Sequence, residues 1–157
     1  MPTTPEVIEL IQNTTLEIIQ HMGIKAHVDS EDLILKGLVF NITPESDPYL
    51  LIGHRGASLH ALEHVVQAIV ARKTQGAYVR FTLDVDDYKR KREWYIKETV
   101  RGALDHIART GRAVALMPMP NFERKLVHAL VGDMRPDAVS VSSGEEPYRR
   151  VIIRIKN

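Results

Sequence analysis

The chain has 157 residues, of which 44% are hydrophobic and 26% charged, as in an ordinary globular protein. It contains no cysteine, which excludes disulfides, thiolate-ligated metal sites and thiol catalysis. No apolar stretch approaches the ~20 residues that a membrane span requires, and the first residues lack the basic and apolar segments of a signal peptide. We therefore expect a cytoplasmic protein that does not insert into a membrane.

Charge is divided unevenly along the chain, although the net charge is only +1. Residues 1–52 contain two basic and eight acidic residues, whereas residues 53–157 contain 19 basic and 12 acidic residues. This asymmetry indicates an anionic partner for the later two-thirds of the chain. It does not distinguish nucleic acid from a phosphorylated ligand or an acidic protein.

The first half of the chain is predicted to form a small α+β domain. Apolar residues at helical spacing predict a helix over residues 5–22, with Pro5 at its start and Gly23 after its end. The following elements are predicted as strands over 24–28 and 33–42, a short helix and a glycine-rich turn within 44–56, a helix capped by Ser58 that continues to about residue 72, and a strand over 78–85. Gly37, inside the second strand, indicates a bulge or a close approach of another segment.

The second half is predicted to place helices on another small sheet. Asp86 or Asp87 can cap a long helix over 88–109, which Gly111 ends. A short strand over 114–116, a helix over 122–131 and strands over 138–141 and 149–155 follow. The fold class is therefore α+β with two small domains, which we place at residues 1–86 and 87–157.

A glycine-rich turn, Gly53-His54-Arg55-Gly56, lies between the short helix and the long helix that follows it. Two glycines let a phosphodiester backbone approach closely, and the next helix points amide donors and its positive dipole end at the same place. His54 and Arg55 can donate hydrogen bonds to phosphates. This arrangement is typical of KH domains, whose Gly-x-x-Gly loop clamps about four nucleotides of a single strand.

Two further clusters leave a metal-dependent enzyme open as an alternative. His60 and His64 belong to an H-x-x-E-H pattern and would share one helix face, as the zinc ligands of an inverted zinc-protease motif do. Three carboxylates near the end of the 78–85 strand could hold Mg²⁺ for phosphodiester hydrolysis, although acidic residues at a helix start are more often caps. These three are Asp84, which we expect to face away from the core, Asp86 and Asp87.

Residues 88–95, with the sequence Tyr-Lys-Arg-Lys-Arg-Glu-Trp-Tyr, form a basic run flanked by aromatic residues. Such a run could follow phosphates while Trp94 or Tyr95 stacks on a base. A solvated helix face with Trp94 in the core is the equally weighted alternative.

A second basic cluster is expected on the helix over 122–131. Arg124 and His128 are four residues apart and would lie one turn apart on the same face, where both could donate to one phosphate. Lys125 and Arg149 would extend this patch. The alternative is a lone surface arginine and a histidine that is hydrogen-bonded within the fold.

Three stretches together resemble the Jag family, the sporulation stage III J–associated bacterial RNA-binding proteins. They are the Leu-Ile-Gly-His-Arg-Gly turn, the Leu-Asp-Val-Asp-Asp-Tyr-Lys-Arg-Lys-Arg-Glu junction, and residues 118–128 together with 143–149. The resemblance covers nearly the whole chain from about residue 5. Many members carry a further N-terminal domain, whereas this sequence starts at the expected KH helix, so the function of that domain is not carried over.

The resemblance implies a type II KH domain, with the order helix-strand-strand-helix-helix-strand, followed by a domain named for an Arg and a His separated by three residues, the Arg-x-x-x-His domain. It implies non-catalytic binding of single-stranded RNA, with single-stranded DNA as a further candidate and no metal or cofactor. It also implies a post-transcriptional regulator linked to bacterial cell elongation and division, and often a small KH-domain protein partner.

We therefore expect two RNA-binding sites in this chain. The residues expected to contact RNA are Gly53, His54, Arg55, Gly56, Arg124, Lys125, His128 and Arg149. The residues expected to floor a base-binding groove are Leu51, Ile52 and Leu59. The family loop commonly has two arginine-like residues, so the histidine in this one predicts a weaker contact that depends on pH. A module whose acidic N-terminal helix docks a protein partner is a third possibility.

Overall fold

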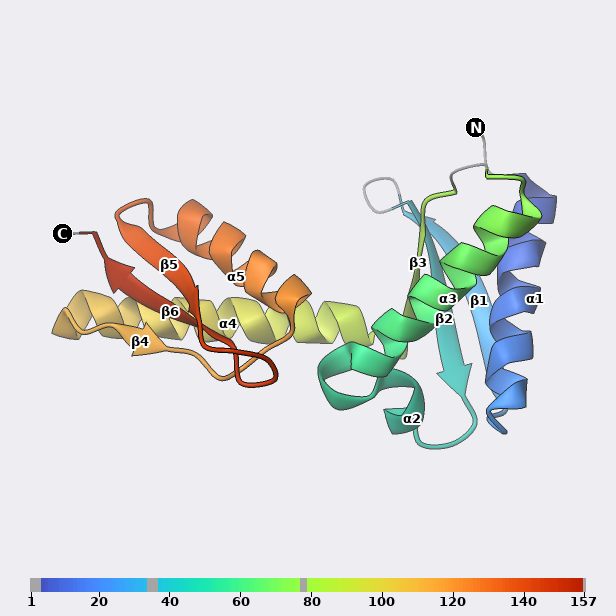
Figure 1. The fold of residues 1–157 in the computed structure, drawn as a ribbon, viewed down its shortest axis with the longest axis horizontal. Coiled ribbons are helices and arrows are strands. Elements are labelled where there is room, and N and C mark those ends of the chain that lie inside the picture. The colour runs from blue at the N-terminus through green and yellow to red at the C-terminus, as the bar shows by residue number, and fades with distance from the viewer. Residues whose placement is uncertain (1–3, 34–36, 77–78, 157) are drawn as a thin grey trace. The chain divides into compact units, whose positions relative to one another are not determined.

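The computed structural model describes residues 4–33, 37–76 and 79–156 and divides the chain into two compact units, Met1–Lys89 and Arg90–Asn157 (Figure 1). Each unit combines helices with one three-stranded sheet, which confirms the expected α+β class. Within the described ranges, every helix is too short or too polar to cross a bilayer.

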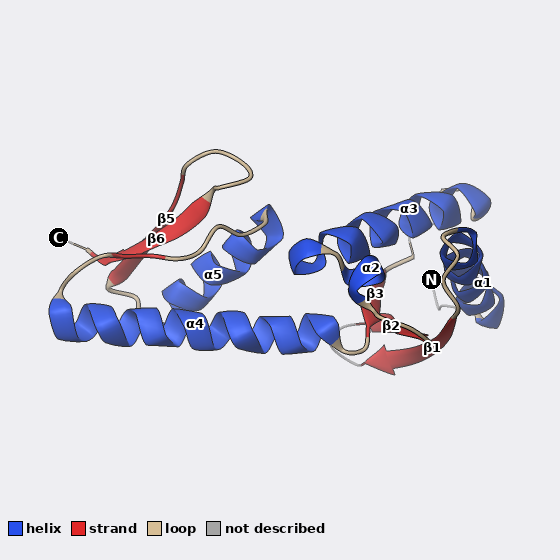
Figure 2. Cartoon of the chain, turned by 90° about the horizontal axis from the view of Figure 1, so that it is seen from below, coloured by secondary structure: helices blue, strands red, loops and turns tan. Residues whose placement is uncertain are grey.

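The first unit has the predicted order of elements. These are α1 (Pro5–His21), β1 (Ala26–Leu33), β2 (Gly37–Pro44), α2 (Tyr49–Ile52), the 3₁₀ turn η1 (His54–Gly56), α3 (Ala57–Lys73) and β3 (Phe81–Val85). The sheet has the order β1-β2-β3, with β1 antiparallel and β3 parallel to β2. The parallel pair requires a crossover connection, which α2 and α3 provide. Helices α1 and α3 cover one face of this sheet (Figure 2).

The boundaries of the first two strands differ from the prediction. Strand β1 continues to Leu33 instead of ending at Val28, and Gly37 starts β2 opposite Leu33 instead of forming a bulge within a strand. Gly37 has φ +73°, which glycine adopts at little cost next to a hairpin connection. Over residues 26–32 only Val28 is buried, so this edge strand lacks the apolar alternation that the prediction used. Residues 34–36 and Tyr78, also predicted as strand, lie outside the described residues.

The core of the first unit fixes the position of the 53–56 turn. Phe40 of β2 and Phe81 of β3 pack edge to face, with ring centroids 5.7 Å apart. Leu51 of α2 and Leu59 of α3 are each 1% exposed and anchor the two helices on either side of the turn. The turn is therefore held at both ends by buried leucines.

The predicted helix caps are wrong at both long helices that follow the turn. Helix α3 begins at Ala57, directly after Gly56, and Ser58 makes no capping hydrogen bond. At α4, Asp84 supplies the cap, because its Oδ1 accepts hydrogen bonds from the N–H groups of Val85 (2.8 Å) and Lys89 (3.0 Å). Asp84 is only 7% exposed, so it does not face away from the core as expected. Burial raises the pKa of this carboxyl, although its two backbone hydrogen bonds act in the opposite direction.

The second unit begins within helix α4. Its elements are α4 (Tyr88–Thr110, whose first two residues belong to the first unit), β4 (Val114–Ala115), α5 (Asn121–Met134), β5 (Ala138–Ser143) and β6 (Arg150–Ile155). The strands form an antiparallel sheet in the order β4-β6-β5. Apolar residues of α4 and α5 pack with Val151 and Ile153 of β6 to form a separate core. This packing fixes which side of α5 faces outward.

Candidate nucleic-acid interface

The backbone of the 53–56 turn can be built only with glycine at both ends. Gly53 has φ +68° and Gly56 has φ +81°. A Cβ on Gly53 would lie 2.1 Å from Oγ of Ser58, and a Cβ on Gly56 would lie 2.8 Å from Cε1 of Tyr88. The two glycines are therefore required by the fold itself, in addition to any ligand that approaches them.

The two side chains between these glycines point to the surface without being held. Arg55 has φ +53°, an unusual conformation for a residue with a Cβ, and is partly exposed, while His54 is exposed. Among the described residues, neither side chain has a hydrogen-bond or ion-pair partner. Helix α3 starts directly after the turn and has no acidic residue in its first turn. Two basic side chains beside the positive end of a helix dipole can bind an anion such as a phosphate.

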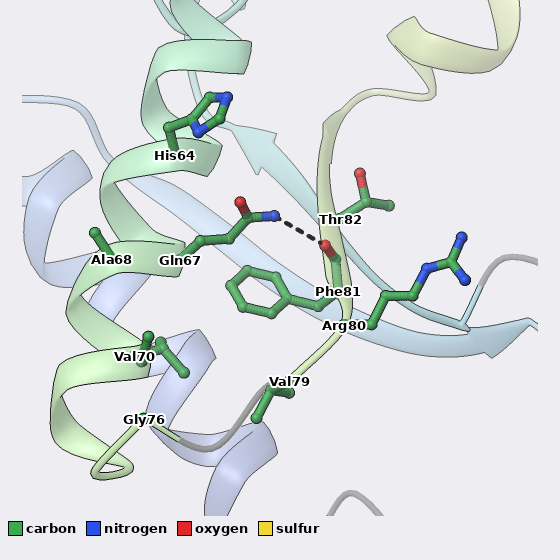
Figure 3. A pocket seen from close by; sticks show the side chains of 10 residues that line it. His64, Gln67, Ala68, Val70, Gly76, Val79, Arg80, Phe81 and Thr82 are labelled. Atoms are coloured by element: carbon green, nitrogen blue, oxygen red, sulfur yellow. Dashed lines mark hydrogen bonds between the residues drawn. The ribbon is translucent and has the colours of Figure 1, made fainter.

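A hollow of about 620 Å³ lies between α3 and the edge strand β3 (Figure 3). Gln67 crosses it and donates a hydrogen bond from Nε2 to the carbonyl oxygen of Phe81 (3.3 Å). His64 and Arg80 line the hollow and supply polar groups. The predicted groove floor is wrong for Leu51 and Leu59, because both side chains are buried in the core, where no ligand can reach them.

Glu63 ties α3 to the end of β3 and the start of α4. Its Oε2 accepts hydrogen bonds from Thr82 Oγ1 (2.6 Å), the Leu83 N–H (2.8 Å) and Lys89 Nζ (2.6 Å). Burial raises the pKa of Glu63, but the hydrogen bonds and the Lys89 charge outweigh burial and leave it below its usual value. This network gives the Glu of the H-x-x-E-H pattern a structural role.

The histidines of the same pattern lie next to each other on α3. The ring centroids of His60 and His64 are 4.6 Å apart, and partial burial together with the neighbouring His64 lowers the pKa of His60. Throughout the part of the chain that the structure describes, no three His, Asp or Glu side chains are grouped to hold a metal ion. The clusters that suggested a metalloenzyme therefore lack a complete ligand set among these residues.

In the second unit, Arg124 is buried and paired rather than presented to solvent. It is 5% exposed, and its Nη1 donates to the carbonyl oxygen of Met119 (2.7 Å) and pairs with Oε1 of Glu146 (2.7 Å). The N–H of Met119 donates to the carbonyl oxygen of Arg149 (3.1 Å), which brings the segment before α5 to the start of β6. Arg124, Glu146 and the backbone of Arg149 thus form one cluster.

His128 is held from the neighbouring strand. Its Nδ1 lies 2.7 Å from Oγ of Ser140 and its Nε2 lies 2.9 Å from Oγ of Ser142, so both ring nitrogens are hydrogen-bonded. Lys125 and the side chain of Arg149 are exposed. We call Arg124, Lys125, His128 and Arg149 the α5 surface. Two of its members are fixed within the fold, and the other two reach solvent.

The sequence reasoning missed the partners of Arg124 and His128. Ser140 and Ser142 alternate along β5 and so point to the same face, but the strand was predicted to end at 141. Glu146 lies in a loop, and no periodic pattern indicates where a loop side chain will lie. These three residues are the functional-site positions that only the structure reveals.

Comparisons with known proteins bear on both units. The family model of the Arg-x-x-x-His domain matches residues 96–154, which include Arg124 and His128. Three relatives carry the name RNA-binding protein KhpB: one from Clostridium symbiosum (36% identical over 110 residues), one from Bacillus subtilis (33% over 122) and one from Lactiplantibacillus plantarum (31% over 142). The matched segments cover 70%, 77% and 90% of this chain respectively. The chain belongs to the Jag family.

This Jag-family chain spans about half the length of the curated relatives that it matches, between 42% and 58% for these three. The match to the L. plantarum relative covers nine-tenths of this chain and so extends well beyond the Arg-x-x-x-His segment. The family relationship therefore concerns both units.

Proposed function

We propose that this Jag-family chain binds single-stranded RNA without catalysing a reaction on it. The observation that carries the proposal is the 53–56 turn, a backbone that tolerates glycine alone at both ends. It sets two basic side chains, without partners among the described residues, beside the N-terminus of α3. The names of the relatives support RNA as the ligand. The missing metal-ligand set among the described residues gives a nuclease or hydrolase no support.

In this proposal residues 1–86 are a type II KH domain. The order of elements in the first unit and its mixed sheet support that assignment. His54 and Arg55 contact phosphates, and the hollow between α3 and β3 receives the bases. Gln67, Arg80 and the outer edge of β3 supply hydrogen-bonding groups for base edges.

Residues 87–157 are proposed as the second RNA-binding domain. Lys125 and Arg149 are exposed and can contact phosphates directly. Arg124 and His128 form the rigid part of the same surface, and a phosphate that contacts Arg124 competes with the Glu146 carboxylate. A cytoplasmic location, a link to cell elongation and division and a small KH-domain partner are proposals that rest on the family resemblance alone.

The test is a fluorescence-anisotropy titration of a labelled single-stranded RNA of about 20 nucleotides at ~50 and ~200 mM salt. Duplex RNA and single-stranded DNA are titrated in parallel, and a gel shows whether the RNA remains intact. We expect affinity that falls with salt, a preference for single strands and no cleavage. Equal DNA affinity would widen the ligand class, and Mg²⁺-dependent cleavage would overturn the proposal.

The decisive variant combines His54→Asp with Arg55→Asp. It should weaken RNA binding about tenfold or more, because it places two negative charges where the phosphates lie. The matched control combines His21→Asp with Lys25→Asp, which makes the same change in charge at exposed residues near the end of α1. If both variants weaken binding equally, the turn has no specific role and only net charge matters.

A further inference from the structure

The basic run that starts helix α4 divides into two functions. Lys89 pairs with Glu63 of the first unit, and Arg92 makes a two-pronged bond to Glu123, with Nε–Oε1 and Nη2–Oε2 distances of 2.7 and 3.0 Å. Glu123 is 1% exposed, so Arg92 neutralises a buried carboxylate of the second unit. Two of the four consecutive basic residues therefore serve the fold.

The other two basic residues lie with two aromatic side chains on the outward side of α4. Arg90, Lys91, Trp94 and Tyr95 line an open hollow of about 490 Å³. Trp94 is 66% exposed and Tyr95 is 54% exposed, so neither belongs to the core, as one of the sequence alternatives had it. A large exposed indole and phenol side by side are unusual on a surface that binds nothing.

The spacing of these four residues forms two parallel pairs. Arg90 precedes Trp94 by four residues and Lys91 precedes Tyr95 by four, so each aromatic ring has a cation one helical turn away on the same side. The Arg92 guanidinium lies 5.1 Å from the centroid of the Tyr95 ring and holds that ring in place. The surface thus repeats one unit, a π-face beside a positive charge.

We propose that this surface, which we call the α4 platform, stacks bases of a single-stranded nucleic acid on Trp94 and Tyr95 while Arg90 and Lys91 contact the adjoining phosphates. The inference rests on the proposed function and adds a third contact region that lies outside both the 53–56 turn and the α5 surface. Aromatic stacking is largely independent of base identity, so the platform would add affinity with little sequence preference.

The charge of the platform favours nucleic acid over a protein partner. Exposed Trp, Tyr and Arg also occur in protein interfaces, where an acidic partner would be needed here. A nucleotide supplies a flat ring and a negative charge in the same repeating unit, which the paired spacing matches. The acidic Glu98 lies one turn beyond Trp94, but its carboxylate is paired with Arg101 (2.8 Å) and does not leave an opposing charge on this face.

Trp94 makes the test direct, because it is the only tryptophan in the chain. Its emission is followed while unlabelled single-stranded RNA is added, and anisotropy of a labelled strand reports total binding under the same conditions. We expect the emission to be quenched over the range in which anisotropy rises. A strand of abasic ribose-phosphate units should bind through its phosphates without this quenching, and equal quenching by the abasic strand would overturn stacking.

Variants then give the contribution of the platform. Trp94→Ala should weaken RNA binding about 5- to 100-fold, and Trp94→Phe, which keeps a ring face, should recover most of the affinity. Arg90→Ala should weaken binding more than Arg109→Ala, a control at the exposed far end of the same helix. Circular dichroism confirms that each variant is folded.

The outcomes separate this inference from the proposed function. If anisotropy reports binding while Trp94 emission is unchanged and Trp94→Ala binds as the wild type does, the platform is overturned and the RNA-binding proposal stands. If the wild-type chain binds no single-stranded nucleic acid, both are overturned.

Discussion

The 53–56 turn and the α5 surface both carry basic side chains, but they hold them in different ways. In the turn the backbone is constrained, with glycines at both ends, while His54 and Arg55 have no partner among the described residues. On the α5 surface the backbone is an ordinary helix, and the side chains of Arg124 and His128 are fixed by neighbouring segments.

This difference separates binding from stability in one region and combines them in the other. Changing a side chain of the turn should alter ligand affinity alone, because the fold does not use that side chain. Changing Arg124 or His128 should alter the fold first and ligand binding second. Variants can therefore measure whether the comparison holds.

The largest effect is expected for Gly53→Ala. The new Cβ would lie 2.1 Å from Ser58 Oγ and 2.8 Å from the Ser58 nitrogen, at a φ of +68°, so the turn must move. We expect a loss of about 3 kcal/mol in the free energy of unfolding of the first unit, measured by amide hydrogen exchange. Arg55→Ala, inside the same turn, should change that free energy by less than ~0.5 kcal/mol.

Gly23→Ala is the matched control for this variant. Gly23 has φ +77°, but a Cβ there would meet no atom within 4 Å. It should cost only about 1–2 kcal/mol for the left-handed conformation. Equal losses for the two alanine variants would mean that the close contact with Ser58 contributes nothing.

The second effect is expected for Arg124→Ala. The variant removes the hydrogen bond to the Met119 carbonyl and the ion pair with Glu146, and should destabilise the second unit by about 2 kcal/mol. Glu146 is 59% exposed, so its loss of a partner contributes little. Hydrogen exchange of α5 and β6 measures the change, and Lys125→Ala serves as the exposed control. A fully stable Arg124→Ala protein would contradict the structural role assigned to this side chain.

The sequence predicts most of the turn and little of the clamp around Arg124. The turn depends on residues that are adjacent in the chain, so Gly53 and Gly56 can be recognised from spacing alone. Arg124 and His128 were correctly placed one turn apart on a helix, but their partners Ser140, Ser142 and Glu146 come from other elements. Their position depends on how β5 and the following loop pack against α5, which local patterns do not encode.

The same reasoning explains the errors within the first unit. Strand β1 has polar residues at 29–32 and lies at the edge of its sheet, so burial alternation, the main signal for a strand, is missing there. Asp84 was read as an outward residue because strand alternation put it opposite Leu83. It is buried because it bonds to the N–H groups of Val85 and Lys89 at the start of α4. Hydrogen-bonding demand at a helix start overrides a hydrophobicity pattern.

The smallest effect, and the sharpest test of the comparison, is expected for Glu146→Gln. If RNA phosphates contact Arg124, they compete with the Glu146 carboxylate, and removing its charge should strengthen RNA binding by up to about fivefold. Glu145→Gln makes the same change in charge at the neighbouring exposed residue and controls for the general gain from losing a negative charge. A gain for Glu146→Gln above that control would mean that Arg124 contacts RNA as well as supporting the fold. Identical gains, measured by anisotropy with the same labelled strand, would restrict Arg124 to its structural role and leave Lys125 and Arg149 as the phosphate contacts of the α5 surface.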